Sequence, residues 1–470
     1  MTYSTLGKNT IEISGSDFIR GMTSGNNLLD GGFSDQSYGI NLESEPGVLS
    51  FNENVTEPST SPIGIMIGCT PNDTTTADPD MFFLAVDADT QDGTYYWWNG
   101  TTLTLKRTDS TNNYIFGGSY IGTYRNEIYA TSDQAITRWT ADDSVFEDDF
   151  YDTSDGWDTL SPHPILAYDN DFYYGNGNEL LRQTAVGVKP SDILTLTEGT
   201  DITALGIDPG SGKMLISTTQ GPIFNLAGNV PSLNKVLYYD GFSNKPVKAI
   251  VVDEMITAFY SVGSTVFVTY GQNLGYWTGS GIQFLRQLDI NLAYDELAYR
   301  DHITSIGSTL FVIEGRFILA FGDIVGGASK AYSYVYRSPV NKLSLICNLG
   351  ENVLGIGTLD EAFLTLDLDT LGINASWYSN RYSFPRPITF NQIVIEYFTS
   401  MPTENNIGAV NVIQENDTLQ TLQNVTNTVA NKYVATLTWP TITSRVIQIN
   451  YTPMQSTQIR RITIYYNDYA

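Results

Sequence analysis

The amino-acid sequence predicts an all-β fold: a β-propeller of about seven blades, with an extended N-terminal arm and a C-terminal antiparallel β-sandwich. The first observation is composition. The 470 residues include 30 Tyr, 21 Phe and 7 Trp beside many Thr and Val, which pack well on a pleated surface. The second is a repeat: GSTVFVTYG, which begins at Gly263, returns as GSTLFVIEG at Gly307. The third is that no segment shows the 3.6-residue apolar period of helices.

The repeat extends over most of the chain as an apolar strand with a Gly or polar turn beside it. Its copies are MFFLAVD from Met81, IYAT from Ile128, FYYGNG from Phe172, MLISTTQG from Met214, VFVTYG from Val266, LFVIEG from Leu310 and VLGIGT from Val353. Successive copies lie about 42 to 52 residues apart. This spacing matches the roughly 40 to 50 residues of a four-stranded propeller blade.

Flanking strands complete the repeated unit. Four copies are preceded, across a tight turn, by another strand: HPILAYDN, ITALGIDP, HITSIG and LSLICNLG. Five copies are followed by a further strand: TYYWWNG, AITRWTA, NELLRQT, LGYWTGS and FILAFGD. A four-stranded blade has two apolar faces, which it cannot bury alone. Stacking the blades in a ring buries both faces and removes long exposed sheet edges.

Composition changes along the chain predict three regions. Residues 1–46 are rich in Gly, Ser, Asn and Asp, and we expect an extended arm that either drapes over the propeller or docks on a neighbouring subunit. Residues 47–378 are expected to form the propeller, with a strand within 47–60, GVLSFN from Gly47, pairing with the last blade to close the ring. Residues 379–470 contain longer alternating segments, such as ITFNQIVIEYF and QIRRITIYYND, which predict the β-sandwich.

The charge balance excludes some partners. Lys and Arg number 24 against 51 Asp and Glu, a formal net charge of −27, which repels phosphate backbones and anionic membranes. We expect neither sequence-specific nucleic-acid binding nor membrane insertion, because no apolar run approaches the ~20 residues of a span. Part of the scarce positive charge, Arg445, Arg460 and Arg461, lies near the C-terminus, where solvation or ion pairs with the acidic ring are expected.

Few residues are candidates for catalysis. The two histidines, His163 and His302, each lead into the first strand of a blade, which favours a structural role over that of a base. No nucleophile elbow, zinc-protease helix or phosphate-binding loop is present in the sequence. The two cysteines, Cys69 and Cys347, are expected to be small buried apolar residues and not a disulfide. The sequence therefore predicts no catalytic, cofactor-binding or metal-binding residue.

Acidic and aromatic clusters leave alternatives open. Asp87, Asp89 and Asp92 approach the spacing of a calcium loop with one residue too many, and eight carboxylates lie between Asp142 and Asp158. Solvated loops are expected there, with calcium as the one cofactor left open. Tyr95, Tyr96, Trp97 and Trp98 suit either blade packing or stacking on sugars. A glycosidase needs only two carboxylates, so that activity stays an alternative.

The whole plan resembles a known class of proteins. The chain combines a Gly-rich arm ending in SEPGVLSFN, a degenerate propeller with the blade SPHPILAYDNDFYYGNGNELLRQ, and a C-terminal segment introduced by YSNRYSFPRPITFNQIVIEYF. This combination resembles the β-propeller virion proteins of tailed bacteriophages and archaeal tailed viruses. These include tail nozzle, head-completion and tail-tip proteins. The resemblance lies in architecture over nearly the whole chain, and it transfers no catalytic residues.

The resemblance implies a structural, non-enzymatic tail or connector protein. It would be made in the host cytoplasm, reside in the virion tail, and assemble in several copies as a ring with other virion proteins. A host receptor or glycan is a further expected partner. The alternative is a cell-surface propeller that binds glycans as an adhesin or cleaves them as a glycosidase.

Overall fold

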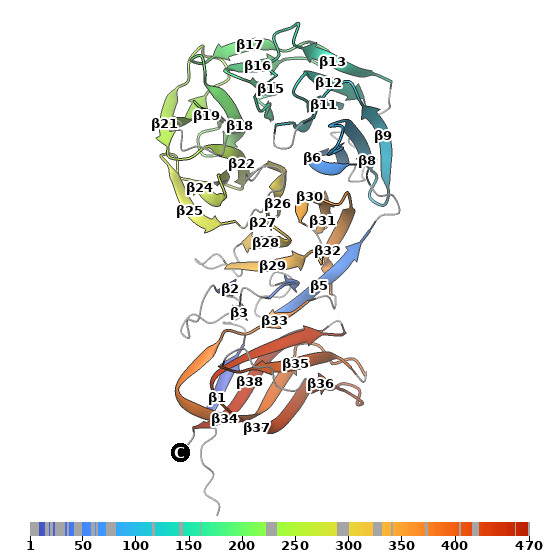
Figure 1. Cartoon of the computed structure of the whole chain (residues 1–470), viewed down its shortest axis with the longest axis vertical. Helices are drawn as coiled ribbons and strands as arrows, with labels where there is room; N and C mark the ends of the chain where they lie inside the picture. Colours follow the sequence, from blue (N-terminus) through green and yellow to red (C-terminus); the bar gives the residue numbers. More distant parts are fainter. Residues whose placement is uncertain are drawn as a thin grey trace, which may run out of the picture. The chain divides into compact units, whose positions relative to one another are not determined.

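A computed structural model describes most of the chain as β-strands (Figure 1). The described residues are 9–14, 18, 22–23, 33–34, 37–41, 49–57, 62, 64–71, 81–114, 118–140, 144–159, 161–221, 233–288, 300–322, 331–339, 342–371, 375–403, 406–415, 423–455 and 457–468. Within them, a search for helices long and apolar enough to cross a membrane finds none. By their internal contacts, the residues group into two compact units: 1–55 with 317–338 and 366–470, and 56–316 with 339–365.

Seven four-stranded blades form the predicted β-propeller. The first three are β6 (Ile65–Pro71), β7 (Met81–Val86), β8 (Gly93–Trp98) and β9 (Leu103–Asp109); β10 (Ile121–Tyr124), β11 (Glu127–Thr131), β12 (Ala135–Thr140) and β13 (Phe146–Asp152); and β14 (Ile165–Tyr168), β15 (Asp171–Asn176), β16 (Glu179–Gln183) and β17 (Ser191–Thr195). The next two are β18 (Asp201–Asp208), β19 (Lys213–Thr219), β20 (Asn234–Tyr239) and β21 (Lys248–Val252); and β22 (Ile256–Val262), β23 (Thr265–Tyr270), β24 (Asn273–Trp277) and β25 (Ile282–Gln287). In every blade for which pairing is described, neighbouring strands are antiparallel.

The sixth blade follows a 3-10 helix, η1 (Arg300–His302), and consists of β26 (Ile303–Ile306), β27 (Thr309–Glu314), β28 (Phe317–Gly322) and β29 (Ala331–Arg337). The seventh contains β30 (Leu343–Gly350), β31 (Val353–Thr358) and β32 (Phe363–Leu371), and its fourth strand comes from the N-terminal region. Every repeat copy in the sequence is the second strand of its blade. The sequence period therefore corresponds to one blade, as predicted.

Burial follows the position of a strand within its blade. The second strands are almost wholly buried, as in β7 and β27, where all six side chains are inaccessible. The outermost strands are largely exposed, as in β21 and β25. This gradient arises because a second strand is covered by a neighbouring blade on each face, whereas an outer strand faces solvent at the rim. It also explains why the second strand carries the strongest repeat signal.

Successive side chains of a second strand pack against different neighbours. In β7, Phe82 joins a cluster with Ile121 and Trp139 of the second blade, whereas Phe83 joins Leu345 and Phe363 of the seventh. Phe82 meets the Trp139 ring edge-on at 5.1 Å, and Phe83 meets Phe363 at 5.0 Å. Because side chains alternate across a strand, one short apolar run holds two blade interfaces together.

The inner strands also approach one another closely. A Cβ atom at Gly206 of β18 would lie 2.3 Å from Cβ of Phe259 in the neighbouring inner strand β22. Hydroxyl groups add polar contacts between blades: Thr131 Oγ1 donates to the carbonyl of His163 at 3.1 Å, and Thr203 Oγ1 donates to that of Ile256 at 2.7 Å. These bonds help to satisfy buried carbonyls near the start of the third and fifth blades.

The fourth strand of the last blade is β5 (Leu49–Thr56). The strand order places β5 beside β32 as the fourth strand of the last blade, and Figure 1 shows the blue strand beside the orange one. Thr365 Oγ1 donates to the carbonyl of Thr56 at 3.3 Å. The other edge of β5 pairs with β38 (Gln458–Asp468) through Leu49 and Ser50. One strand therefore belongs both to the last blade and to the C-terminal sheet.

The C-terminal strands form one strongly bent antiparallel sheet with a sandwich-like core. Its strands are β33 (Trp377–Tyr378), β34 (Tyr382–Tyr397), β35 (Gly408–Ile413), β36 (Gln423–Val425), β37 (Val434–Pro453) and β38. The first part of β37 pairs with β34, and its later part pairs with β33 and β35. The segments KYVATLTW and RVIQINYTP, which the sequence suggests as separate strands, therefore lie in one continuous strand.

The described parts of the N-terminal arm pair with the chain's own strands. β1 (Asn9–Ile13) lies antiparallel to β38, and β4 (Ile40–Asn41) pairs with β5. The short strands β2 (Met22–Thr23) and β3 (Phe33–Ser34) pair with each other. Ile13, Phe18 and Ile40 are wholly buried in the same apolar cluster as Leu49 and Phe51. These segments therefore complete a core within their own chain.

A buried ion pair lies in the second blade and contacts the third. Arg138 donates two parallel hydrogen bonds to Glu127, at 2.7 and 2.6 Å, and Tyr129 donates a third at 2.6 Å. Gln183 of the third blade donates to the Tyr129 hydroxyl at 2.8 Å. Burial alone would raise the pKa of Glu127, but the bonds from Arg138 and Tyr129 outweigh it and lower this pKa. The carboxylate is therefore held in its charged form.

Replacing Arg138 with Met is expected to lower the free energy of unfolding by about 3 to 5 kcal/mol, because it leaves the Glu127 carboxylate buried without its cation. Urea unfolding followed by tryptophan fluorescence measures this loss. The matched control is Lys189→Met, which breaks the more exposed pair with Asp155 and should cost less than about 1 kcal/mol. Equal losses in the two variants would contradict the prediction.

Candidate functional site

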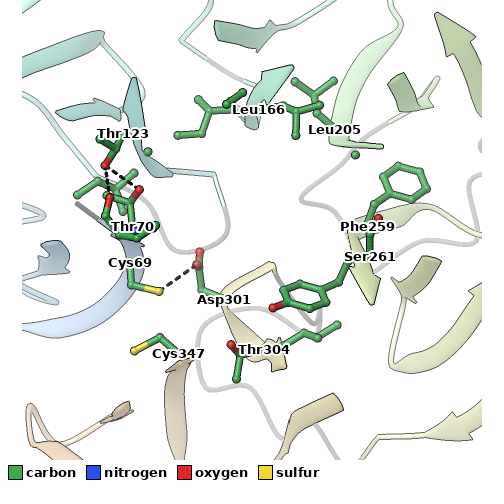
Figure 2. Close-up of a pocket in the computed structure, with 18 of the residues that line it drawn as sticks. Cys69, Thr70, Thr123, Leu166, Leu205, Phe259, Ser261, Asp301, Thr304 and Cys347 are labelled. Atoms are coloured by element: carbon green, nitrogen blue, oxygen red, sulfur yellow. Dashed lines mark hydrogen bonds between the residues drawn. The ribbon is translucent and has the colours of Figure 1, made fainter. Parts of the chain in front are cut away.

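The ends of the inner strands surround a central cavity of about 830 Å³ (Figure 2). Each blade contributes residues from its first strand: β6, β10, β14, β18, β22, β26 and β30. All the lining residues belong to the unit of residues 56–316 and 339–365. A volume of this size is in the range of sites for small ligands or for a few side chains of a partner.

Exposure distinguishes the mouth of the cavity from its deeper wall. The exposed lining residues, Pro71, Ala167, Pro209, Ser261 and Asn348, lie at or just after the C-terminal ends of inner strands. The buried lining residues precede them in the same strands and are mostly apolar: Ile121, Ile165, Leu205, Phe259 and Ile346. The cavity therefore opens where the inner strands turn into the second strands, and its wall is largely apolar.

One charged group stands in this wall. Asp301 precedes β26, is only 7% exposed, and is the sole charged residue among the described residues that line the cavity. Its Oδ1 lies 3.9 Å from Sγ of Cys69, which donates to it, and Figure 2 shows the carboxylate facing the open centre beside Cys69. Because burying a carboxylate among apolar side chains is costly, this position is chemically distinct from the rest of the wall.

Three hydroxyl groups of the wall, those of Thr70, Thr123 and Ser261, donate their protons to other protein atoms. Thr123 Oγ1 donates to the carbonyl of Pro71 at 2.7 Å and lies 2.9 Å from Thr70 Oγ1. Since Thr123 has one proton, Thr70 is the donor of the bond between them. Ser261 Oγ donates to the carbonyl of Ile207 at 2.9 Å.

Neither histidine lines the cavity. His163 is wholly buried, stacks on Trp157 at 4.0 Å between ring centroids, and has Nδ1 3.2 Å from the carbonyl of Gly175. Burial lowers the pKa of His163 to about 4, and burial likewise lowers that of His302 to about 4. Both imidazoles are therefore neutral at pH 7. They stand two residues before β14 and one residue before β26, so their positions in the two blades are not equivalent.

The other candidate residues are dispersed. Asp87 accepts hydrogen bonds from the backbone N–H groups of Asp89 and Thr90, at 2.8 and 3.1 Å, which describes a hairpin turn. Within the described ranges, no three His, Cys, Asp or Glu side chains are grouped to hold a metal ion. Residues 141–143 of the acidic run lie outside the described residues. Tyr95, Tyr96 and Trp98 are buried in blade packing.

The cysteines and the C-terminal arginines have identifiable surroundings. Cys69 and Cys347 are both free thiols, and both line the central cavity from adjacent blades. Arg461 forms ion pairs with Glu396 and, at 3.5 Å, with Glu12. Its partners therefore include acids of neighbouring strands in its own sheet.

Sequence reasoning missed the cavity residues. Asp301 stands beside His302, and the histidine was the more conspicuous candidate. The signal that singles out Asp301 is its place directly before an inner strand, since the ends of these strands converge at the centre of a ring.

Comparisons with known proteins give likenesses of fold. No protein-family model and no curated protein matches the chain. A solved structure described as YCF48 bound to D1 peptide shares 10% identity over 66% of this chain and 95% of its own, with a TM-score of 0.45. YCF48 from Cyanidioschyzon merolae shares 10% identity over 67% of this chain and 99% of its own, with a TM-score of 0.44. An exo-β-1,3-galactanase from Phanerochaete chrysosporium with galactose shares 9% identity over 88% of this chain and 100% of its own, with a TM-score of 0.36. Likenesses of this size say nothing about what the chain binds.

Proposed function

We propose that the chain is a structural component of a tailed-virus virion, assembled in several copies as a ring in the tail or connector. The architectural resemblance of the sequence suggests this class. Among the described residues that line the central cavity, Asp301 is the one carboxylate. A glycosidase uses two carboxylates about 5 to 10 Å apart, one as acid and one as base or nucleophile. The described part of the wall does not bring such a pair together.

A second feature fits a structural role. Strand β5 is shared by the last blade and the C-terminal sheet, so the hydrogen-bonded strand order runs without interruption from β30 to β36. The acidic surface, with a net charge of −27, would also let DNA pass without adhering.

Two measurements test the proposal. Purified particles, analysed by quantitative mass spectrometry and by imaging, should contain the chain in a fixed number of copies arranged around the tail axis. The isolated chain should release no sugar from β-linked oligosaccharides. Saccharide release that is lost in Asp301→Asn would overturn the non-catalytic assignment. Specific saccharide binding without release, by a chain absent from particles, would favour the alternative of a glycan-binding adhesin.

A further inference from the structure

We propose that the outer edge of the fourth blade, strand β21, pairs with β21 of a second copy of the chain in an antiparallel, two-fold symmetric contact. β21 is the last strand in the order of its sheet, and among the described strands it pairs only with β20. Figure 1 shows it at the rim of the propeller. An edge strand presents a row of backbone N–H and C=O groups that can pair with another chain.

Four other outer strands carry charge where a partner strand would lie. β13 contains three consecutive acids in FEDDFYD, and the charges of the others are Lys106 and Arg107 in β9, Asp192 in β17 and Arg286 in β25. Charged residues on an edge strand oppose pairing with another chain. β21, KAIVV, has its one charged residue, Lys248, at its start. Of these five outer strands, it is therefore the one best suited to pairing.

One face of this edge is an exposed apolar stripe. Val247, Ala249 and Val251 are alternate residues, so their side chains lie on the same face. Val247 and Val251 are 54% and 64% exposed, although valine is ordinarily a buried residue. Ile250 and Val252, which alternate with them, pack into the apolar cluster that joins the fourth and fifth blades. The stripe is apolar surface that a second strand can cover, and covering it favours association.

The charges that flank the strand identify a second copy as its partner. Lys245 and Lys248 stand at the N-terminal end of the segment, Asp253 and Glu254 stand at its C-terminal end, and all four are exposed. Lys248 Nζ donates to the carbonyl of Gly279 at 2.9 Å, a neutral partner that leaves the positive charge in place. Two antiparallel copies bring the basic end of each segment beside the acidic end of the other. The segment is therefore complementary to itself.

A register centred on Ile250 satisfies both the apolar and the charged positions. It places Ala249 opposite the partner's Val251, and the two-fold axis repeats this pair. Lys248 is then a diagonal neighbour, on the same face, of the partner's Glu254, at the roughly 7 to 8 Å that long side chains can span. A shift by one residue would move each stripe to the opposite face, so this register is specific.

Sedimentation velocity of the full chain measures the contact. The parent chain is expected to form a reversible dimer between about 1 and 200 µM, because a contact made mainly by one pair of strands is small. A parent chain that stays monomeric over this range would overturn the proposal. The contact joins two copies and is separate from the proposed ring, which is tested by the number of copies in particles, so either idea can fail without the other.

Charge reversal tests the partner and the register together. Lys248→Glu brings a carboxylate near the partner's Glu254 at both ends of the symmetric contact, and should weaken the dimer at least about tenfold. The double variant Lys248→Glu/Glu254→Lys exchanges the two charges and should restore the affinity to within about threefold. The matched control is Lys432→Glu, which makes the same change in net charge at an exposed residue of the other compact unit and should leave dimerisation unchanged.

A second variant tests the apolar stripe. Val251→Asp places a charge opposite the partner's Ala249, and the dimer should be lost over the whole concentration range. Because Val251 is 64% exposed, the thermal unfolding of this variant should match that of the parent chain. Dimerisation that survives Val251→Asp, or a Lys248→Glu variant that is not rescued by Glu254→Lys, would contradict the proposed contact.

Discussion

Deletion of residues 1–57 is expected to abolish the single cooperative unfolding transition of the propeller. The deletion removes β5, the fourth strand of the last blade, and leaves the edge of β32 without its partner. It also removes Leu49 and Phe51 from the apolar cluster of the C-terminal sheet, where both are wholly buried and Phe51 is stacked on Tyr451 at 5.6 Å. Burial of two such side chains is worth roughly 3 to 6 kcal/mol, so the C-terminal sheet should be destabilised as well.

Differential scanning calorimetry and analytical ultracentrifugation measure the effect. The truncated chain should show a broad, weak transition and concentration-dependent association through the exposed edge. The control is deletion of residues 1–14, which removes β1 from the edge of the C-terminal sheet and leaves β5 in place. This shorter deletion should retain the propeller transition. A 1–57 deletion that unfolds cooperatively at the temperature of the parent chain would contradict the assigned closure.

The second large effect expected is acid destabilisation by the two buried histidines. Their pKa values fall from the ordinary 6.5 to about 4 in the folded chain, because burial disfavours the imidazolium. Below pH 6.5 the unfolded chain therefore binds more protons than the folded one, and stability decreases as the pH falls from about 6.5 to about 4. At pH 5 the loss is on the order of 2 kcal/mol for each histidine.

The measurement is the free energy of unfolding in urea at several values between pH 7.5 and 5.0. Because carboxylates also titrate toward the acid end, the comparison is with His163→Gln/His302→Gln. That double variant is expected to be less stable at pH 7.5. Between pH 7.5 and 5.0, its free energy of unfolding should fall by roughly 4 kcal/mol less than that of the parent chain. A profile parallel to that of the parent chain would show that the histidines are not the cause.

The blade count and the ring closure follow from sequence because their causes are local. The second strand of a blade packs against a neighbouring blade on each face, so it is apolar throughout. The spacing of these strands is therefore recognisable even where the amino acids differ between blades. GVLSFN precedes the first full blade as a single strand, and a closed ring needs a strand from the N-terminal side to complete its last blade. The sequence therefore predicts that GVLSFN pairs with the last blade. The outer strands are harder to predict: β21, KAIVV, exposes most of its side chains and gives no alternation of apolar and polar residues.

The C-terminal sheet illustrates a different limit. KYVATLTW and RVIQINYTP suggest two strands because Pro440 and a polar stretch separate them, and proline is rare inside a paired strand. The structure keeps both in β37, which changes its pairing partner from β34 to β35 along its length. A strand that changes partner in this way has no local signal, since the change depends on where β34 and β35 lie.

The cavity could not be predicted because its residues are assembled by ring closure. Cys69 lies 232 positions before Asp301, and Cys347 lies in the next blade along the chain, yet all three line one cavity. Each alone reads as an ordinary residue at the start or end of a strand. Only the radial arrangement of the inner strands brings these three residues together.

The place of β5 has a consequence for biosynthesis. This strand is translated about 300 residues before β32 and about 400 residues before β38, its neighbours in the last blade and the C-terminal sheet. At about 5 to 20 residues per second, the backbone groups of β5 that pair with β32 and β38 wait tens of seconds for their partners. Translation pauses or a holding chaperone during that interval would govern the yield of native protein more than the intrinsic stability of any single blade.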